Sequence, residues 1–232
     1  LYFLRHTSPD SMRFRAVADA IFSPLFSTPM VACFGPEKIK LTPPQKDMDF
    51  PLMKALGLRR SKRKWKYEPV PIQDLSNLLW AACGITREET KSSKSRRTAP
   101  SATNSQEIRV YVALEDGFYL YEEKEHQLKL VQQVDLRTDI GIQKMMRSAP
   151  VGLIFVSDFS KLSRYVRKDE GRRWFISGTD AGYISQNIYL YCAAAGLSTV
   201  VLGLVDRDKL HEKMGLQPHE KVVYTQVVGR SI

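Results

Sequence analysis

The sequence lacks the short motifs that mark the commonest enzyme folds. It has no GxGxxG or GxxxxGK[ST] phosphate loop, no HExxH zinc motif and no GxSxG nucleophile elbow. Its three cysteines, Cys33, Cys83 and Cys192, lie far apart and form no CxxC pair, which excludes a cysteine-rich zinc module and argues against a disulfide framework. The four histidines lie in polar or loop segments, away from any plausible nucleophile. A hydrolase or metalloenzyme is therefore disfavoured, and we predict no metal ligands; the absence of an arranged catalytic Ser, His or Asp suits a protein whose bound cofactor carries the chemistry.

Long uninterrupted apolar runs are also missing. The most apolar stretch, residues 176–205, carries one charge, Asp180. Its helical part is about 17 residues long and contains Asp180, Gln186 and Asn187, which makes it too short and too polar for a membrane span. We expect no stable membrane insertion.

This stretch instead predicts a buried helix. Thr179 can accept free amide protons at a helix start, and Gly196 can adopt the left-handed conformation that ends a helix, so residues 179–195 are predicted helical. Apolar side chains occupy almost every face of this helix. More than one face must therefore be covered, as at a subunit interface. Residues 198–205 follow as an apolar strand.

The composition indicates one folded domain with an anionic partner. The length of 232 residues suits one substantial domain, and 43% hydrophobic residues suffice for a core. The net charge of +10 arises from 35 Lys and Arg against 25 Asp and Glu, and the cations cluster at residues 59–66 and 91–97. Such an excess suits nucleic acid, a membrane surface or a phosphorylated small molecule.

The first fifty residues differ in character from the rest. Residues 12–33 have a basic start and a partly apolar middle, like an export or lipoprotein signal, but Asp19, Pro24 and Pro29 interrupt the apolar run. Residues 37–50 contain a Pro-Pro pair and are expected to form an extended linker. We therefore divide the chain into an N-terminal arm or signal-like extension with a linker, 1–50, and a folded domain, 51–232. A cytoplasmic location is expected, with export or lipid anchoring as the alternative.

Helices and strands are interspersed without regular alternation, which favours an α+β fold. Apolar spacing, caps and breakers predict further helices at residues 51–58, 71–85, 136–147, 161–175 and 207–214. Apolar runs predict strands at 108–114, 118–124, 126–131, 151–158 and 221–229, with an Asp-Gly turn between the first two. Residues 87–98 are charged and serine-rich without periodicity, and they are predicted to form a mobile loop.

Four separated segments carry groups suited to binding. They are Arg59, Arg60, Ser61 and Arg63; the loop Ala99 to Gln106; Leu202 with Gly203; and Gly229 with Arg230. The loop is rich in hydroxyl and amide groups, and a glycine at a strand end lets a flat ligand approach the backbone. Taken singly, each segment is also what a solvated surface, an ordinary loop, a strand bulge or a free tail would contain.

Together and in this order, the segments resemble the FMN-dependent nitroreductase family over roughly residues 51–232. The shared patterns are RRSxR (59–63), PSxxNSQ (100–106), DAGxxxQN (180–187), AAxGLxTVxLG (193–203) and VGR (228–230). The sequence LLWAACGI before a variable loop, followed by a GFYLY hairpin, is nearest to the branch that includes dehydrogenases of azole-modified peptides. The resemblance implies a central, mostly antiparallel sheet flanked by helices, and a homodimer with the long buried helix at its interface and two FMN sites.

The resemblance also assigns roles to the residues of the segments. Arg59 and Arg230 would hold the FMN phosphate with help from Ser61, and Arg63 would lie near the N1/O2 edge of the flavin. The backbone of Leu202 and Gly203 would face N5/O4. Contacts from the other subunit would come from Pro100, Ser101, Ala102 and Asn104. Arg60 and Gln106 belong to the same motifs and complete the predicted cofactor-binding set. A guanidinium fork suits a phosphate, and a cation near N1/O2 favours flavin reduction.

The implied activity is hydride transfer from NADH or NADPH through flavin N5 to a small acceptor such as a quinone, nitro compound or enone, in a ping-pong cycle. Many oxygen-insensitive members carry an acidic residue where this chain has Leu202, so its pocket is expected to be more apolar. One alternative is flavin-dependent dehydrogenation of azoline-containing peptides. Another is a nucleic-acid-binding protein that uses the two basic clusters. The last leaves residues 100–106 and the apolar helix unexplained, so we predict no nucleic-acid partner.

Overall fold

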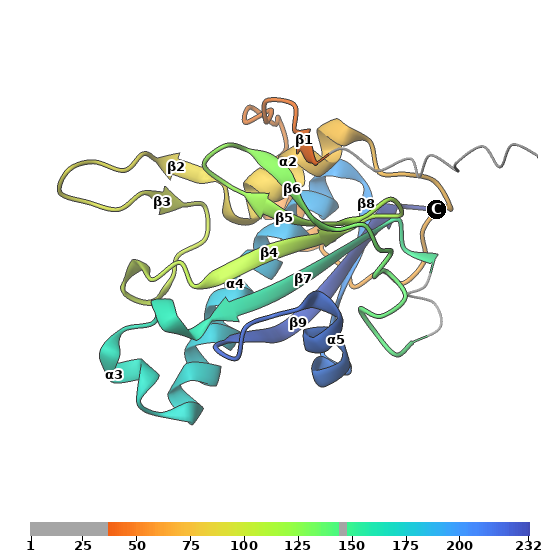
Figure 1. Cartoon of the computed structure of the whole chain (residues 1–232). Helices are drawn as coiled ribbons and strands as arrows, with labels where there is room; N and C mark the ends of the chain where they lie inside the picture. The colour runs from red at the N-terminus through yellow and green to blue at the C-terminus, as the bar shows by residue number, and fades with distance from the viewer. Residues whose placement is uncertain (1–36, 144–147) are drawn as a thin grey trace, which may run out of the picture. The chain divides into compact units, whose positions relative to one another are not determined.

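The computed structural model describes residues 37–143 and 148–232, and every structural statement below concerns this part of the chain (Figure 1). The signal-like stretch 12–33 and its Cys33 lie outside the described residues, as does the end of the helix predicted at 136–147.

A seven-stranded sheet forms the centre of the described part. Its strands are β1 (Lys38–Lys40), β4 (Ile108–Ala113), β5 (Phe118–Glu122), β6 (Gln127–Gln132), β7 (Val151–Asp158), β8 (Leu197–Leu202) and β9 (Glu220–Arg230). The spatial order is β1-β6-β5-β4-β7-β9-β8, and each neighbouring pair is antiparallel (Figure 1). The predicted α+β fold with a mostly antiparallel central sheet is confirmed.

The helices of the described residues surround this sheet. They are α1 (Leu52–Leu58), α2 (Ile72–Cys83), α3 (Arg164–Arg167), α4 (Glu170–Ala195) and α5 (Arg207–Met214), with single 3-10 turns η1 (Ala102–Asn104) and η3 (Phe159–Lys161). Among these, no helix combines the length and apolar character needed to cross a membrane. A separate hairpin joins β2 (Ile85–Arg87) to β3 (Arg96–Arg97).

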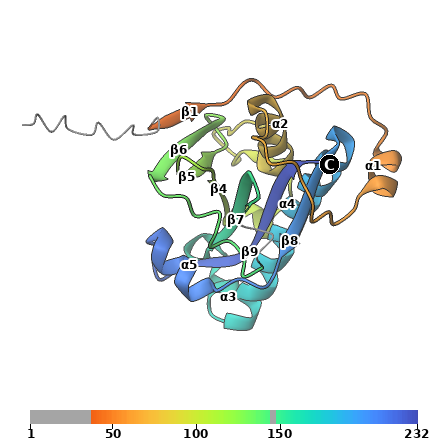
Figure 2. The ribbon, with the colours of Figure 1, turned by 90° about the vertical axis from the view of Figure 1, so that its right-hand side faces the viewer.

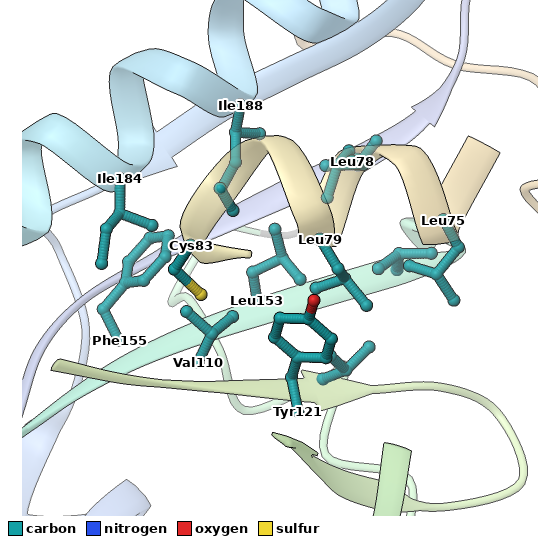
Figure 3. Packing of buried hydrophobic residues seen from close by; sticks show 14 of the residues in the cluster. Leu75, Leu78, Leu79, Cys83, Val110, Tyr121, Leu153, Phe155, Ile184 and Ile188 are labelled. Carbon is teal, nitrogen blue, oxygen red and sulfur yellow. The ribbon is translucent and has the colours of Figure 1, made fainter. Parts of the chain in front are cut away.

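Alternation along the strands divides the core into two clusters. On β7, Leu153 and Phe155 face one cluster while Ile154 and Val156 face the other, because successive strand residues point to opposite faces. Helices α2 and α4 pack on the first face, as Figure 3 shows. Helix α5 and the turns of residues 136–140 cover the second. Helix α1 packs against α4 (Figure 2).

Helix α4 is longer than predicted. It ends as expected, at Gly196 with φ of 69°, but it begins at Glu170 and not at Thr179. The side chain of Asp169 caps the true start by accepting a hydrogen bond of 2.7 Å from the amide of Arg172. The helix predicted at 161–175, running up to or into the central helix, is confirmed in part: its last residues are the first turns of α4, but η3 and α3 precede them as separate elements.

Three further predictions need correction. Residues 136–143 form turns and no helix, because the Asp135 carboxylate accepts hydrogen bonds from both the amide and the guanidinium of Arg137. Residues 87–98, predicted as a loop, begin and end in the short strands β2 and β3. The expected linker 37–50 contributes β1, which pairs with β6. The predictions for α1, α2, α5, β4 to β7, β8 and β9 are confirmed within a few residues.

The core packing leads to a first prediction. Leu79 of α2 is fully buried in the first core cluster, whereas Leu204, after β8, is 60% exposed. We expect Leu79→Ala to lower the free energy of unfolding by about 2–5 kcal/mol, because a cavity adds to the lost apolar burial. The matched Leu204→Ala should change it by less than about 0.5 kcal/mol. Urea unfolding of both variants measures the difference, and equal effects would contradict the core assignment.

Candidate functional site

The phenol of Tyr189 connects the first predicted segment, Arg59 to Arg63, with the strand that carries the third, Leu202 and Gly203. Tyr189 lies on α4, and its hydroxyl accepts a hydrogen bond of 2.9 Å from the amide of Val201 in β8. The hydroxyl also lies 3.1 Å from Ser61 Oγ, and the guanidinium of Arg59 stacks 5.4 Å from the ring centroid. The structure therefore brings Arg59 and Ser61 together with the end of β8, next to Leu202.

The segment after Ser61 runs along the open side of β8. The amide of Lys62 donates to Thr199 O at 3.0 Å, and the amide of Lys66 donates to Arg230 O at 2.9 Å. Lys62 Nζ also donates to Ser231 Oγ at 3.2 Å. Because β8 is the last strand of its sheet, its outward backbone groups need partners, and this segment supplies them. The chain end and the residue-60 region are thus neighbours.

Arg230 already has a carboxylate partner within the chain. Its Nε lies 3.2 Å from Glu68 Oε1, and both side chains are partly exposed. This contact uses one of the five N–H donors of the guanidinium. Arg230 pairs with Leu197, at the opposite end of β8 from Leu202, whereas Arg59 stacks on Tyr189, which bonds Val201. An anion would have to bind between them.

A cavity of about 280 Å³ lies beside this segment. It is lined by Leu58, Arg60, Lys62, Tyr189, Cys192, Ala193, Leu197 and Thr199. Arg60 also donates to Gly57 O and Arg59 O, at 2.9 Å each, which holds the turn after α1. Arg63 is exposed, and its side chain reaches back toward Ser61 O at 3.5 Å.

The glycine at the end of β8 is open to approach. Gly203 is exposed, and a Cβ atom built there would meet no atom within 4 Å. Its carbonyl accepts a hydrogen bond of 3.2 Å from Arg207 Nη2. The Leu202 side chain, in contrast, is buried in the second core cluster. The position therefore presents no exposed side chain from either residue.

The loop 100–106 forms a second, separate group. The amide of Ala102 donates to Asp180 Oδ2 at 2.9 Å, and Ser101 Oγ accepts from the amide of Gln106 at 3.0 Å. The side-chain amides of Asn104 and Gln106 both donate to Ser95 O, at 3.1 and 2.7 Å. Pro100 begins this loop and is exposed. The loop conformation is thus fixed by hydrogen bonds.

Buried carboxyl groups anchor this loop. Glu107 is fully buried and accepts a hydrogen bond of 2.6 Å from Ser105 Oγ, and Asp180 is 3% exposed. Burial raises the pKa of Asp180 to about 7; the hydrogen bond with Glu107 and its charge add to the rise, while the amide of Ala102 opposes it. At neutral pH Asp180 is therefore about half protonated, far more than an exposed aspartate would be.

A single chain does not bring the two groups together. Asp180 holds the loop, Tyr189 holds Arg59 and Ser61, and the two residues are nine positions apart on α4, roughly 14 Å. The sequence analysis identified neither Tyr189 nor Glu107 as part of these groups. Asp180 could have been singled out from the sequence, because it is the one charged residue in the apolar stretch 176–205.

Comparisons with known proteins match most of the chain to one family. Residues 57–230 match the family model described as nitroreductase family. A candidate nitroreductase of Methanocaldococcus jannaschii is 27% identical over 184 residues, covering 75% of this chain and 88% of the relative. The crystal structure of a candidate nitroreductase of Ralstonia eutropha JMP134 is similar, with 38% identity, a TM-score of 0.76, and coverage of 85% of this chain and 90% of that one.

A more distant structure shares the fold alone. It is the NADPH:FMN oxidoreductase of Vibrio harveyi complexed with NAD+, with 19% identity, a TM-score of 0.55, and coverage of 78% of this chain and 68% of that one.

The buried carboxyl pair predicts how stability depends on pH. Between about pH 4 and pH 7 the folded state keeps a proton on Asp180 that the unfolded chain releases, so the free energy of unfolding should fall as pH rises. Asp180→Asn cannot release this proton, and its amide can still bond Ala102 and Glu107. We expect the variant to flatten the fall, which is at most about 1.4 kcal/mol per pH unit. Urea unfolding between about pH 5 and pH 8 measures it.

The exposed Asp47→Asn is the control, and it should keep the wild-type pH dependence. An Asp180→Asn variant that retains the full slope would show that another group carries it.

Proposed function

The chain belongs to the nitroreductase family, and from this premise we propose that it is a flavin-dependent oxidoreductase that binds FMN between two copies of itself. Bound FMN would accept a hydride at N5 from NADH or NADPH and pass it to a small acceptor in a ping-pong cycle. The distant Vibrio harveyi structure, named NADPH:FMN oxidoreductase, supports this cofactor and reductant. In this proposal residues 51–232 form the flavin-binding domain.

The donor groups at the open side of β8 fit a phosphorylated ligand. Arg59 offers a guanidinium fork, Ser61 offers a hydroxyl, and Arg230 keeps donors beyond the one facing Glu68. Tyr189 orients the first two residues, because its hydroxyl and ring contact them directly. These residues would hold the phosphate between Arg59 and Arg230. The contact of Tyr189 with both Arg59 and Ser61 is the single observation that carries the proposal.

The remaining segments suit the ring system. Arg63 would place a positive charge near the N1/O2 edge, where it stabilises the negative charge of the reduced ring. The backbone at Gly203 is open, so a flat ring could approach it closely. Leu202 is apolar and its side chain is buried in the core, so the chain places no charged side chain at this position. The acceptor would therefore bind over an apolar and backbone-lined surface, which suits flat quinones, enones or nitro compounds.

The second subunit would supply the loop 100–106. Helix α4 supports this, because it exposes two large apolar side chains beyond the face that packs on the sheet: Phe175 is 73% and Tyr183 is 46% exposed. Helix α1 adds the exposed side chains of Leu52, Met53 and Leu56. Contiguous exposed apolar residues of this kind mark protein interfaces. Pairing two chains through α4 would allow Pro100, Ser101, Ala102, Asn104 and Gln106 of one chain to reach the flavin held by the other.

A visible spectrum tests the cofactor assignment. The purified full chain should be yellow, release FMN on denaturation, and bleach without oxygen when NADH or NADPH is added. A colourless protein that cannot be reconstituted with FMN would refute the proposal. Bleaching by an azoline-containing peptide, and by neither nicotinamide, would instead identify a dehydrogenase of such peptides.

Arg59 is the residue whose loss should weaken FMN binding most directly. We expect Arg59→Gln to raise the Kd for FMN roughly 10- to 150-fold, since a hydrogen bond to a charged group contributes about 1.5–3 kcal/mol. Fluorescence quenching of titrated FMN measures this change. Lys129→Gln removes the same charge from an exposed position on β6 and should leave the Kd unchanged. Equal Kd values for Arg59→Gln and wild type would remove Arg59 from the phosphate site.

Tyr183 tests the dimer. We expect Tyr183→Glu to shift the protein from dimer to monomer in sedimentation experiments, because a charge would be buried in an apolar interface. The same variant should lose FMN, since each site would lack its second half. Val131→Glu, on the exposed side of β6, should remain dimeric. A monomeric variant with full FMN content would show that one chain completes the site.

A further inference from the structure

The hairpin of β2 and β3 places two arginines side by side. Arg87 and Arg96 are direct partners across the hairpin, so their side chains start from the same face about 5 Å apart. Both residues are exposed. Figure 1 shows the hairpin extending beyond the sheet, with β3 leading back toward β4. Two like charges directly opposite each other destabilise a strand pair.

No carboxylate of the described residues pairs with either arginine. Two acidic residues of this region have other partners: Glu89 binds Lys124 at 2.8 Å, and Glu123 pairs with Arg97. Glu88, next to Arg87 in the chain, forms no ion pair with either arginine of the hairpin. The guanidinium of Arg97 also donates to Ile108 O at 2.9 Å, so this arginine is already engaged. The hairpin therefore keeps two cations together on one face without neutralising them.

These arginines open onto a cavity next to the candidate flavin loop. The cavity has a volume of about 400 Å³ and is lined by Arg87, Arg96, Arg97, Thr98, Ala99, Pro100, Ser101 and Asn104. Three of these residues, Pro100, Ser101 and Asn104, belong to the loop proposed to contact the flavin. An anion bound by the arginines would therefore belong to a molecule that can extend toward the flavin.

We propose that Arg87 and Arg96 form a subsite for the phosphate monoester of a co-substrate. Two guanidinium forks can bind such a dianion through several charge-assisted hydrogen bonds, and the dianion removes the repulsion between them. The phosphate has two possible sources, the 2′-phosphate of NADPH or a phosphorylated acceptor. The subsite would thus set the preference for co-substrates. This inference rests on the proposed function, because the cavity would lie beside the flavin only if the loop 100–106 contacts it.

NADP+ and NAD+ provide the first test, because they differ only in the 2′-phosphate. Both are titrated calorimetrically into the oxidised, FMN-loaded full-length protein. If the 2′-phosphate is the ligand, wild type should bind NADP+ at least about 10-fold more tightly than NAD+. The double variant R87Q/R96Q should lose this preference and keep its affinity for NAD+. The variant K91Q/K94Q removes the same charge from the hairpin turn outside the cavity, and it should keep the preference.

Inorganic phosphate provides the second test. If NADP+ and NAD+ bind equally to wild type, but phosphate binds to wild type and not to R87Q/R96Q, the subsite serves a phosphorylated acceptor. If R87Q/R96Q binds NADP+ and phosphate as wild type does, the proposal is wrong. The single variant R96Q replaces the double variant if the latter does not fold.

The FMN content of each variant separates this inference from the proposed function. Wild-type FMN content in R87Q/R96Q means that a loss of anion binding reports on the arginines alone. If no variant and no wild-type preparation binds FMN, the proposed function fails, and phosphate titration still reports on the arginine pair.

Discussion

The burial of α4 is the constraint on which the rest of the structure depends. The helix packs one face on the sheet and on α2, and the polar contacts of both site segments start from it. Asp180 holds the loop 100–106 through the amide of Ala102, and Tyr189 holds Arg59, Ser61 and the end of β8. Because a helix is rigid, the distance between these two anchors is fixed. The two halves of the site keep their positions although they are far apart in the sequence.

The charged groups are distributed between the same two parts of the site. At the loop end, Glu107 and Asp180 are buried, and burial raises the pKa of Asp180 to about 7, so its negative charge is reduced. At the strand end and on the hairpin, cations remain exposed, and Arg230 alone among the proposed ligands has a carboxylate partner within the described residues. Positive charge thus faces the places where an anionic ligand would bind. This arrangement explains how a chain with a net charge of +10 can use that excess for recognition.

The sequence allowed the fold to be predicted where the signal was local. Apolar runs identified the strands β4 to β9, and glycines identified the ends of α4 and α5. Errors arose where one side chain redirected the backbone: Asp169 started α4 early, and Asp135 turned the chain at a site where Leu136 and Ile140 have helical spacing. For the site, short motifs indicated the segments that carry donors. The contacts through Tyr189 and Glu107 could not be predicted, because they join residues from distant parts of the chain.

The segment after Ser61 has a consequence for association between chains. The outward carbonyl of Thr199 and the outward amide of Val201 are bonded by Lys62 and Tyr189, so β8 offers few free groups to a strand of another molecule. The residues that position Arg59 thereby also protect the edge of the sheet. Release of this segment would expose a template for intermolecular strand addition. Retention of the ligand and solubility of the chain are therefore linked by the same few hydrogen bonds.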